Sequence, residues 1–465
     1  RVDRRQRQMC RRDSPYTAQR CAETLHPRLI ITVDCGTNAA ETVAEMRRAG
    51  IEVVITDHHL PSPHSRPDAA AVVNPRYAET QTAWSDLAGV GVAFKLCHAL
   101  VKAGRQQGWP AADRLDLREW LDLVAIGTIA DIVPLLGENR ILARHGIERL
   151  NRAPLTGLRA LREVAGVQGE ADTYHVGFLL APRLNAVGRL DSPADALALL
   201  MTDDDEVALP LAQRLDASNR DRQQLEARTW QEAERWMAEH FDPTRDLGIV
   251  VAGEGWHPGI VGLVASRLCK RYGRPAVAIA ISEDGAARGS CRSIESFPIL
   301  EALHACADLL DSYGGHALAA GLTLSEDRIG AFRQRFCDFA RERLAGTDLR
   351  PTLIIDQWIA LGEADNALLE AVQQLRPFGV ENPAPVWAVR GAHVLRASTV
   401  GDGGRHLRLT LSDGGAQREA IGFYMGDLPL PSGPLDIAFT LEPDEFNGQR
   451  RPQLKLVDFR PSPME

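Results

Sequence analysis

The sequence lacks the features of a membrane-spanning, secreted or cysteine-stabilised protein. None of its apolar runs reaches the roughly 20 residues that a membrane-spanning helix needs. The arginine-rich start is followed by no apolar segment of the kind that a secretory signal contains. The eight cysteines lie apart and form no Cys-x-x-Cys pair, so neither a zinc ribbon nor a redox motif is indicated. Isolated cysteines suit a reducing compartment, and we predict a cytoplasmic protein.

The sequence also lacks a surplus of basic residues. It has 53 lysines and arginines against 62 acidic residues, which gives a formal net charge of −9. This excludes a surface coated in positive charge, although a local basic groove can still bind nucleic acid on an acidic chain. A length of 465 residues with 45% hydrophobic content indicates a globular protein of about two to four domains.

The first part of the chain reads as strands separated by helices. Three apolar, largely β-branched runs are expected to be strands: residues 28–34, 51–57 and 69–74. A helical pattern over 37–50 predicts a βαβ unit whose parallel strands are buried on both faces. The carboxyl ends of parallel strands share one edge of a sheet, where open α/β sheets bind ligands. Asp34 and Asp57, which each end a strand, are therefore expected to converge.

The rest of the chain changes character three times. A long polar helical stretch over 203–241 suggests a connecting helix or an ordinary surface helix, and a fresh α/β pattern begins at 247. After 350, short apolar runs alternate with turn residues, which favours an OB-fold barrel over another small β domain. We predict an α/β fold with four parts: a parallel-sheet domain over 1–200, a connecting helix over 201–242, a second α/β domain over 243–348 and a β-barrel over 349–465.

Acids and histidines gather at the predicted strand ends. The triplet Asp57-His58-His59 ends one strand, on the same edge as Asp34, and such a group is seldom only structural. Asp131 lies in an apolar stretch, where an ionised carboxylate needs a partner such as a metal, unless it is simply the acid of a turn. Carboxylates and imidazoles suit Mn²⁺, Fe²⁺ or Zn²⁺, and Mg²⁺ less well. Such a cluster could activate a metal-bound hydroxide for attack on phosphorus.

Glycine-rich stretches supply candidate phosphate contacts. In residues 289–293 and 314–321, glycines let backbone N–H groups approach an anion. Arg292 could grip a phosphate bidentately, and His316 could contact or protonate a phosphate oxygen. The alternative is a pair of turns packed against helices. The stretch 181–190 adds three polar residues that could hold phosphates or equally form salt bridges and caps: Arg183, Asn185 and Arg189.

The order of these motifs resembles a known family. Seven motifs follow one another as in the RecJ family, which comprises single-strand-specific 5′-to-3′ DNA exonucleases of the DHH phosphoesterase superfamily. The motifs are VDCG, ITDHH, IGTIADIVPL, APRLNAVGR, GWHPGIVGLVASRL, GSCRS and GGHALAAG. Each motif alone is weak, but the series is specific and extends from about residue 14 to the C-terminus. Residues 375–387 resemble the start of the family's OB region. The resemblance implies a DHH domain and a DHH-associated domain joined by a long helix, followed by an OB-fold.

The resemblance also implies roles for individual residues near the metal. Asp34, His58 and Asp131 would bind Mn²⁺ or Mg²⁺, with two ions in the family. Asp57 would support the ligands, and His59 would face the scissile phosphate.

Other residues would contact DNA, by the same resemblance. His316 would act at the active site, Ser290 and Arg292 would read the 5′ phosphate, and five further residues would contact DNA: Arg183, Asn185, Arg189, His257 and Gly315. The barrel would hold single-stranded DNA through stacking aromatics, although core packing is the expected role of most candidates: Trp387, Phe423, Tyr424 and Phe446. A single-strand-binding protein and a RecQ-type helicase are expected partners of a monomer.

One family motif has no counterpart in this sequence. The family carries an Asp-x-Asp-Gly motif upstream of VDCG that supplies metal ligands, whereas residues 1–13 are arginine-dense and unlike the family. The acidic run Asp203-Asp204-Asp205 is better placed to cap a helix. We expect an N-terminally truncated or frame-shifted member with weak metal binding and little nuclease activity. The alternatives are a non-catalytic DNA-binding remnant and a phosphodiesterase for short oligonucleotides or cyclic dinucleotides, although the latter generally lacks the β domain.

Overall fold

The chain folds into two compact units. The computed structural model describes residues 15–62, 66–77, 85–152, 154–190, 193–444 and 451–463. The first unit contains residues 1–155, 167–181 and 353–465, and the second contains 156–166 and 182–352. No helix in these described ranges is both long and apolar enough to span a bilayer.

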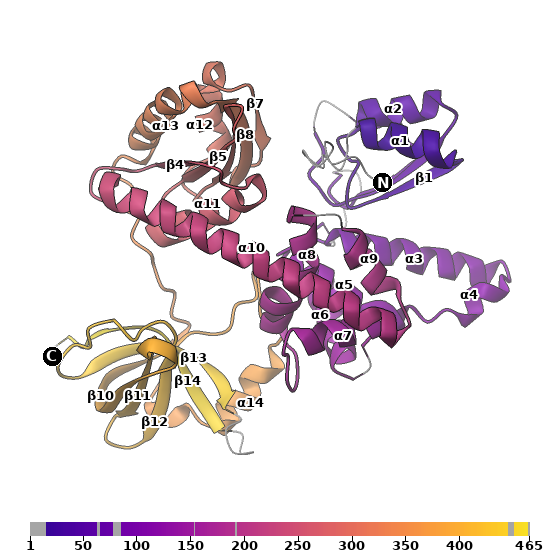
Figure 1. Cartoon of the computed structure of the whole chain (residues 1–465). Helices are drawn as coiled ribbons and strands as arrows, with labels where there is room; N and C mark the ends of the chain where they lie inside the picture. The colour runs from indigo at the N-terminus through magenta and orange to yellow at the C-terminus, as the bar shows by residue number, and fades with distance from the viewer. Residues whose placement is uncertain are drawn as a thin grey trace. The chain divides into compact units, whose positions relative to one another are not determined.

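The first unit begins with a parallel sheet (Figure 1). Its three strands, in spatial order, are β1 (Leu29–Val33), β2 (Glu52–Thr56) and β3 (Ala71–Val73). Both strand pairs are parallel, as the sequence predicts. Helix α1 (Pro15–Leu25) precedes the sheet, and α2 (Ala40–Arg48) connects β1 to β2. Apolar residues of α2, of β2 and of the turn between them form the local core: Val43, Met46, Ile51, Val53 and Ile55.

The prediction that the strands are buried on both faces is wrong for β1. Leu29, Ile31 and Val33 are each about half exposed, whereas the alternate residue Ile30 packs against the core. Successive side chains of a strand point to opposite faces, so a sheet that is covered on one side leaves every second residue in solvent. Within the described residues, β1 is an edge strand whose outer face has no covering element.

Helices build the remainder of the DHH-like domain in the first unit. They are α3 (Gly89–Gln106), α4 (Pro110–Arg114), η3 (Leu117–Trp120), α5 (Leu121–Ala130), α6 (Gly137–Arg152) and the π-helix η4 (His175–Leu180). Their shared core includes Val92, Val124 and Leu142. Helix α5 is apolar around its circumference, which is typical of a helix enclosed by its neighbours.

The second unit contains the predicted long helix. It begins with α7 (Thr156–Val164), α8 (Ala181–Leu190), α9 (Ala194–Met201) and α10 (Asp205–His240). The side chain of Asp204 caps α10 by accepting a hydrogen bond of 2.9 Å from the backbone N–H of Glu206. The acidic run therefore starts a helix, as predicted, because carboxylates satisfy free N–H groups at helix N-termini.

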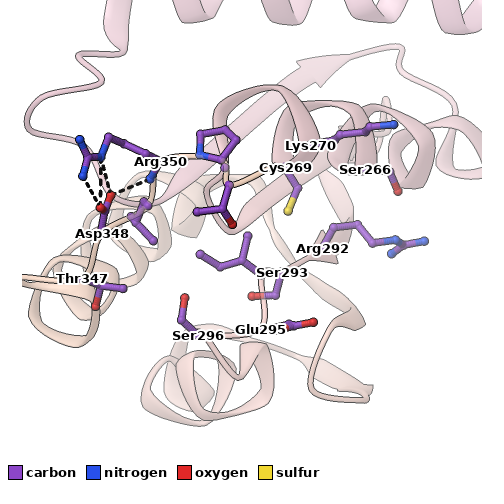
Figure 2. Close-up of a pocket in the computed structure, with 15 residues that line it drawn as sticks. Ser266, Cys269, Lys270, Arg292, Ser293, Glu295, Ser296, Thr347, Asp348 and Arg350 are labelled. Carbon is purple, nitrogen blue, oxygen red and sulfur yellow. Dashed lines mark hydrogen bonds and ion pairs between the residues drawn. The ribbon is translucent and has the colours of Figure 1, made fainter. Parts of the chain in front are cut away.

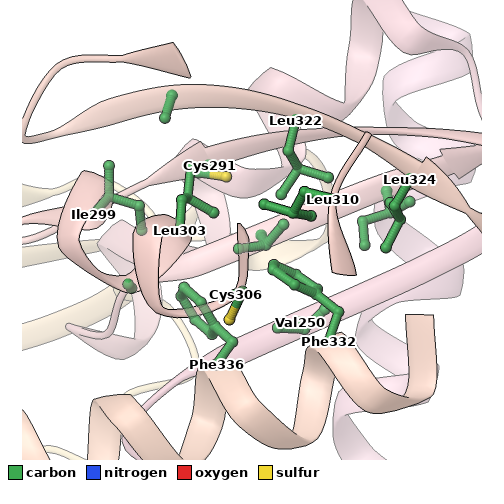
Figure 3. Packing of buried hydrophobic residues seen from close by; sticks show 14 of the residues in the cluster. Val250, Cys291, Ile299, Leu303, Cys306, Leu310, Leu322, Leu324, Phe332 and Phe336 are labelled. Atoms are coloured by element: carbon green, nitrogen blue, oxygen red, sulfur yellow. The ribbon is translucent and has the colours of Figure 1, made fainter. Parts of the chain in front are cut away.

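A mixed sheet with helices follows in the second unit. Its strands, in spatial order, are β4 (Ile249–Glu254), β5 (Ala276–Ile281), β6 (Ala286–Arg292), β8 (Ala319–Ser325) and β7 (Ser312–Gly315). Its helices are α11 (Pro258–Tyr272), α12 (Ile299–Ala305), η5 (Ala307–Leu309), η6 (Glu326–Arg328) and α13 (Ile329–Leu344). Figure 3 shows Phe332 and Phe336 of α13 in the core with Val250 and Cys291 of the sheet.

The C-terminal part of the first unit is the predicted barrel. Its elements are β9 (Gln357–Trp358), η7 (Leu361–Glu363), α14 (Asn366–Gln374), β10 (Trp387–Val400), η8 (Asp402–Gly404), β11 (His406–Ser412), β12 (Gln417–Gly422), β13 (Leu435–Asp444) and β14 (Arg451–Pro461). The long strand β10 pairs with both β11 and β13, which closes the circuit β10-β11-β12-β14-β13. Closure leaves no free edge among these five strands.

Candidate active site

The ends of β1 and β2 bring acids and histidines together. Asp34 follows β1 in the left-handed conformation, with φ of 62°, and its N–H donates to the Thr56 carbonyl over 2.9 Å. Aspartate adopts this conformation more readily than most residues. The bond keeps Asp34 beside the end of β2, where Asp57, His58 and His59 follow directly. The predicted convergence of the strand ends is therefore confirmed.

His58 lies between two carboxylates. Its Nε2 is 3.1 Å from Asp34 Oδ1 and 3.4 Å from Asp131 Oδ2. Asp131 reaches this position as the residue that caps the C-terminal end of α5. The three residues expected to bind metal, which are 24 and 73 positions apart, therefore meet at one point.

These three side chains fit a divalent cation. Both ring nitrogens of His58 are buried, and neither makes a hydrogen bond to a described residue. A buried polar atom without such a bond costs about 1–3 kcal/mol, and a cation would remove that cost. Asp34, His58 and His59 also offer ligand atoms that all lie within 4.8 Å of one another. Carboxylate oxygens with an imidazole nitrogen form a donor set that suits Mn²⁺.

Asp57 holds the loop that carries the histidines. Its buried carboxylate accepts hydrogen bonds from the backbone N–H groups of Thr37, His58 and His59 over 3.0, 2.8 and 3.2 Å. It also lies 2.7 Å from His59 Nδ1. Burial by itself would raise the pKa of Asp57, but the hydrogen bonds from His59 and Thr37 outweigh it and hold the pKa below its usual range. The same bond raises the pKa of the half-exposed His59. Asp57 is thus an ionised anchor for His59.

Asn74 is a supporting residue that the sequence did not reveal. It follows β3 and is buried, and its Nδ2 donates to Thr37 Oγ1 over 2.8 Å and to the His59 carbonyl over 2.9 Å. It therefore ties the loops after all three strands together. The available signal was a polar residue at a third strand end, on the edge where Asp34 and Asp57 had already been placed.

Gly89 is a second residue that sequence reasoning missed. It is the first residue of α3, and a Cβ added there would lie 2.3 Å from Asp34 Oδ1 and 2.7 Å from Asp34 Cγ. No side chain fits beside the carboxylate at that distance. The N-terminal end of α3 thus faces Asp34, in the orientation in which the helix dipole favours a negative charge.

The predicted phosphate residues Ser290 and Arg292 are adjacent in the second unit. Both lie on β6, and Arg292 Nη1 donates to Ser290 Oγ over 3.1 Å and to the Cys291 carbonyl over 2.8 Å. A Cβ at Gly262 of α11 would come within 3.1 Å of Ser290 Oγ. His257 caps the same helix, since its Nδ1 accepts from the Gly259 N–H over 3.0 Å. Burial lowers the pKa of His257, which suits a neutral, accepting imidazole.

The second glycine-rich motif forms the turn between β7 and β8. The N–H of His316 donates to the Ala319 carbonyl over 2.8 Å, and the His316 side chain is exposed. Gly315 has φ of 150°, and a Cβ there would lie 2.4 Å from the Ala319 carbonyl oxygen. Strands β6 and β8 are neighbours with Ser290 opposite Gly321. The two motifs are therefore side by side within the second unit.

Arg292 also lines a cavity of the second unit (Figure 2). The cavity has a volume of about 700 Å³, and Lys270 and Ser293 are among the other residues around it. Arg350, on its far side, is paired with Asp348 by hydrogen bonds from Nε and Nη2 of 3.0 and 2.6 Å. Besides this pair, the charged residues around the cavity are the cations Lys270 and Arg292 and the acid Glu295.

The three residues of α8 that were expected to contact DNA differ in their surroundings. Arg183 Nε donates to Asp216 Oδ1 of α10 over 2.9 Å, and both side chains are largely buried. Of the two alternatives for Arg183, the structure therefore shows a salt bridge, and a phosphate contact remains a prediction. Asn185 is exposed, whereas the side chain of Arg189 lies outside the described residues.

Exposed aromatics on the barrel correct one expectation. Trp387 is partly buried against the barrel core, but Phe423 and Tyr424 are exposed, so core packing is wrong for these two. They follow β12 in a turn, and both rings lie 5.2 Å from the ring of His406. Lys455 Nζ is 5.4 Å from the Phe423 ring centroid. Phe446 lies outside the described residues.

The fold and the acid–histidine cluster place the chain in the DHH class of proteins. Residues 4–128 match the model of the DHH family N-terminal domain, residues 246–342 that of the DHHA1 domain, and residues 355–458 that of the RecJ OB domain.

The particular family is RecJ, to which the chain belongs. It is 38% identical to the single-stranded-DNA-specific exonuclease RecJ of Dickeya dadantii, over 93% of this chain and 77% of the relative. It is also 38% identical to RecJ of Bacillus subtilis, over 92% of this chain but only 53% of that protein. The chain thus spans about half of the latter. The crystal structure of Thermus thermophilus RecJ in complex with Mn²⁺ superposes with a TM-score of 0.81 at 33% identity, covering 96% of this chain and 64% of that one.

Proposed function

We propose that this chain removes nucleotides from the 5′ end of single-stranded DNA, with Mn²⁺ or Mg²⁺ held by Asp34, His58 and Asp131. The observation that carries the proposal is the buried His58 ring, whose nitrogens make no hydrogen bond to the residues that the structure describes and whose Nε2 faces two carboxylates at 3.1 and 3.4 Å. Relatives named single-stranded-DNA-specific exonucleases, and T. thermophilus RecJ structures in complex with Mn²⁺ and with Mg²⁺, support it.

A bound divalent cation would supply Lewis-acid stabilisation of the phosphodiester and a water of lowered pKa. The chain's own residues position the reacting groups. Asp57 engages Nδ1 of His59, which leaves Nε2 as the nitrogen that can meet a phosphate oxygen. Because the pKa of His59 is raised, its imidazolium can donate a hydrogen bond from Nε2–H to the negative charge that grows during hydrolysis.

The second unit would recognise the end of the DNA strand. Ser290 and Arg292 adjoin each other and offer a hydroxyl and a guanidinium to a terminal phosphate. In this proposal His316 and Gly315 contribute at the reacting phosphate, and four residues contact the strand: Arg183, Asn185, Arg189 and His257. A single-strand-binding protein, a RecQ-type helicase and a monomeric state remain part of the same proposal.

The barrel would hold the strand away from the metal. Phe423 and Tyr424 are exposed, and Lys455 lies near the Phe423 ring. Nucleobases stack on exposed aromatic faces with little dependence on sequence, which suits an enzyme that must pass every base.

A nuclease assay with labelled oligonucleotides tests the proposal. The purified chain is incubated with 5′-phosphorylated single strands and with duplexes, in Mn²⁺, in Mg²⁺ and in EDTA. We expect metal-dependent shortening of the single strand alone, with no shortening by His58→Ala. Cleavage that persists in EDTA or in His58→Ala would contradict the proposal, and binding without cleavage would indicate the non-catalytic alternative.

A further inference from the structure

Two aromatic side chains stack on each other at the surface of the first unit. The ring centroids of Tyr174 and Phe178 are 5.1 Å apart with an angle of 28° between the planes. Tyr174 is 56% exposed and Phe178 69% exposed. Aromatic rings contribute most to stability when they are buried, so a stacked pair left in solvent is unusual. Both rings belong to the π-helix η4 and the residue that precedes it, and π-helical turns are frequent at functional sites.

The aromatic pair is carried by an element that packs beside the candidate metal site. Gly177, the neighbour of Phe178, lies against the end of α5, where a Cβ on Gly177 would be 3.7 Å from Ile129 Cγ2. The residue that caps this end of α5 is Asp131, whose carboxylate faces His58. The aromatic pair and the metal ligand therefore stand on two elements in contact.

Ile132, directly after Asp131, adds a second anomaly. It has φ of 59° and is 71% exposed. A β-branched residue in the left-handed region is a true outlier, and such strain persists where the surrounding structure enforces it, often at ligand sites. Its N–H donates to the Ile129 carbonyl over 3.2 Å, so the tight turn is hydrogen-bonded in place. A strained and exposed apolar residue thus follows the metal ligand.

The charges around the aromatic pair permit the approach of a polyanion. Asp172 is the acid nearest in sequence to Tyr174, and its carboxylate is engaged by two cationic or protonatable groups. His175 Nδ1 lies 2.7 Å from Asp172 Oδ1, and Arg376 Nη1 lies 3.6 Å from Asp172 Oδ2. These two groups balance the negative charge of the Asp172 carboxylate, so that charge does not by itself repel a polyanion from Tyr174 and Phe178.

We propose that Tyr174 and Phe178 form a platform on which unpaired nucleobases stack beside the metal site. The proposal rests on the proposed function, because it assigns the strand being hydrolysed as the occupant. Single-strand-binding surfaces use flat aromatic faces in this way, since every base has a π-face. A protein partner would also cover apolar residues, but the stacked rings and the adjoining candidate metal ligand Asp131 favour a nucleic-acid strand.

Equilibrium binding without metal tests the platform. A fluorescent single-stranded oligothymidylate is titrated with the purified chain in EDTA, so that no cleavage occurs. Replacing both aromatics, as Tyr174→Ala with Phe178→Ala, should weaken binding roughly 10- to 100-fold, while Tyr174→Phe, which keeps the ring, should bind as the original chain does. Trp109→Ala is the matched control, because Trp109 is a 51% exposed aromatic of the same unit in the segment between α3 and α4.

An abasic strand separates stacking from a structural effect. The original chain should bind an oligonucleotide of abasic sugars more weakly than oligothymidylate, and the double variant should bind the two alike. Equal binding of oligothymidylate by the original chain and the double variant would overturn the platform and leave the patch to a protein partner. An equal loss on both strands would also overturn it. If the original chain binds no single-stranded DNA, it is the proposed function that fails instead.

Discussion

Replacing Gly89 with alanine should weaken metal binding while leaving the fold intact. An added Cβ would lie 2.3 Å from Asp34 Oδ1, 2.7 Å from Asp34 Cγ and 2.8 Å from Asp34 Cβ. Ordinary contacts of a Cβ begin at 3.4 Å, so the carboxylate must retreat by about 1 Å. Metal–ligand distances tolerate deviations of only about 0.2 Å. Asp34 would therefore leave its ligand position, and we expect affinity for Mn²⁺ to fall about 10- to 100-fold, the range seen when supporting residues of metal sites are changed.

The melting temperature of Gly89→Ala in EDTA separates a displaced ligand from a folding defect. The preference for alanine over glycine, up to about 1 kcal/mol in a helix interior, offsets part of the strain that the added Cβ places on Asp34. The melting temperature should thus stay close to that of the original chain, whereas a folding defect would lower it.

The assay is the electron paramagnetic resonance signal of free Mn²⁺ during titration with protein. Gly91→Ala is the control, because it lies in the same helical turn and the nearest atoms to its Cβ would be those of the Leu87 side chain, with the flexible end Cδ2 closest at 3.1 Å. Gly91→Ala should bind Mn²⁺ as the original chain does. Native affinity in Gly89→Ala would refute the claim that α3 fixes the position of Asp34.

Three further predictions concern the metal site, His59 and the barrel. Mn²⁺ at about 100 times its dissociation constant should add about 2.7 kcal/mol to the free energy of unfolding, and calorimetry should show no such gain for His58→Ala. Asp57→Asn should lower the pKa of His59 in an NMR titration, because Asp57 raises that pKa in the folded chain. The contribution of His59 to stability is therefore present below about pH 6.5 and is lost as the pH rises through the folded pKa. The stability of the variant should lack this pH dependence. In the barrel, burial tends to raise the pKa of Asp436, but hydrogen bonds from Ser462, Gly391 and Arg460 hold the pKa low. Urea unfolding should therefore show Asp436→Asn destabilised by about 1–2 kcal/mol at pH 7, and the difference should vanish as the pH falls below about 3.8. An unchanged unfolding midpoint at pH 7 would count against this prediction.

The sequence was sufficient for the part of the site that depends on strand order. Parallel strands with one crossover helix must end on the same edge, so Asp34 and the Asp57-His58-His59 triplet could be placed together from the pattern alone. The position of Asp131 could not be derived from the pattern, because local periodicity does not indicate that the end of α5 lies beside His58.

The residues that escaped prediction depend on packing between elements that are distant in sequence. Gly89 matters only because α3 begins against Asp34, and Asn74 only because β3 returns beside the loop at Thr37. The pairing of Arg183 with Asp216 spans 33 positions and needs the arrangement of α8 and α10. The exposed face of β1 was missed because an apolar alternation does not reveal how many faces of a sheet are covered.

The most direct test of the account is electron spin-echo spectroscopy of Mn²⁺ bound to the purified chain. Nitrogen that is coordinated to Mn²⁺ modulates the echo, and among the described residues His58 is the imidazole that lies between the carboxylates of Asp34 and Asp131. We expect a nitrogen modulation that disappears in His58→Ala and persists in the exposed control His145→Ala. Bound Mn²⁺ without nitrogen modulation, or a modulation that survives in His58→Ala, would contradict it.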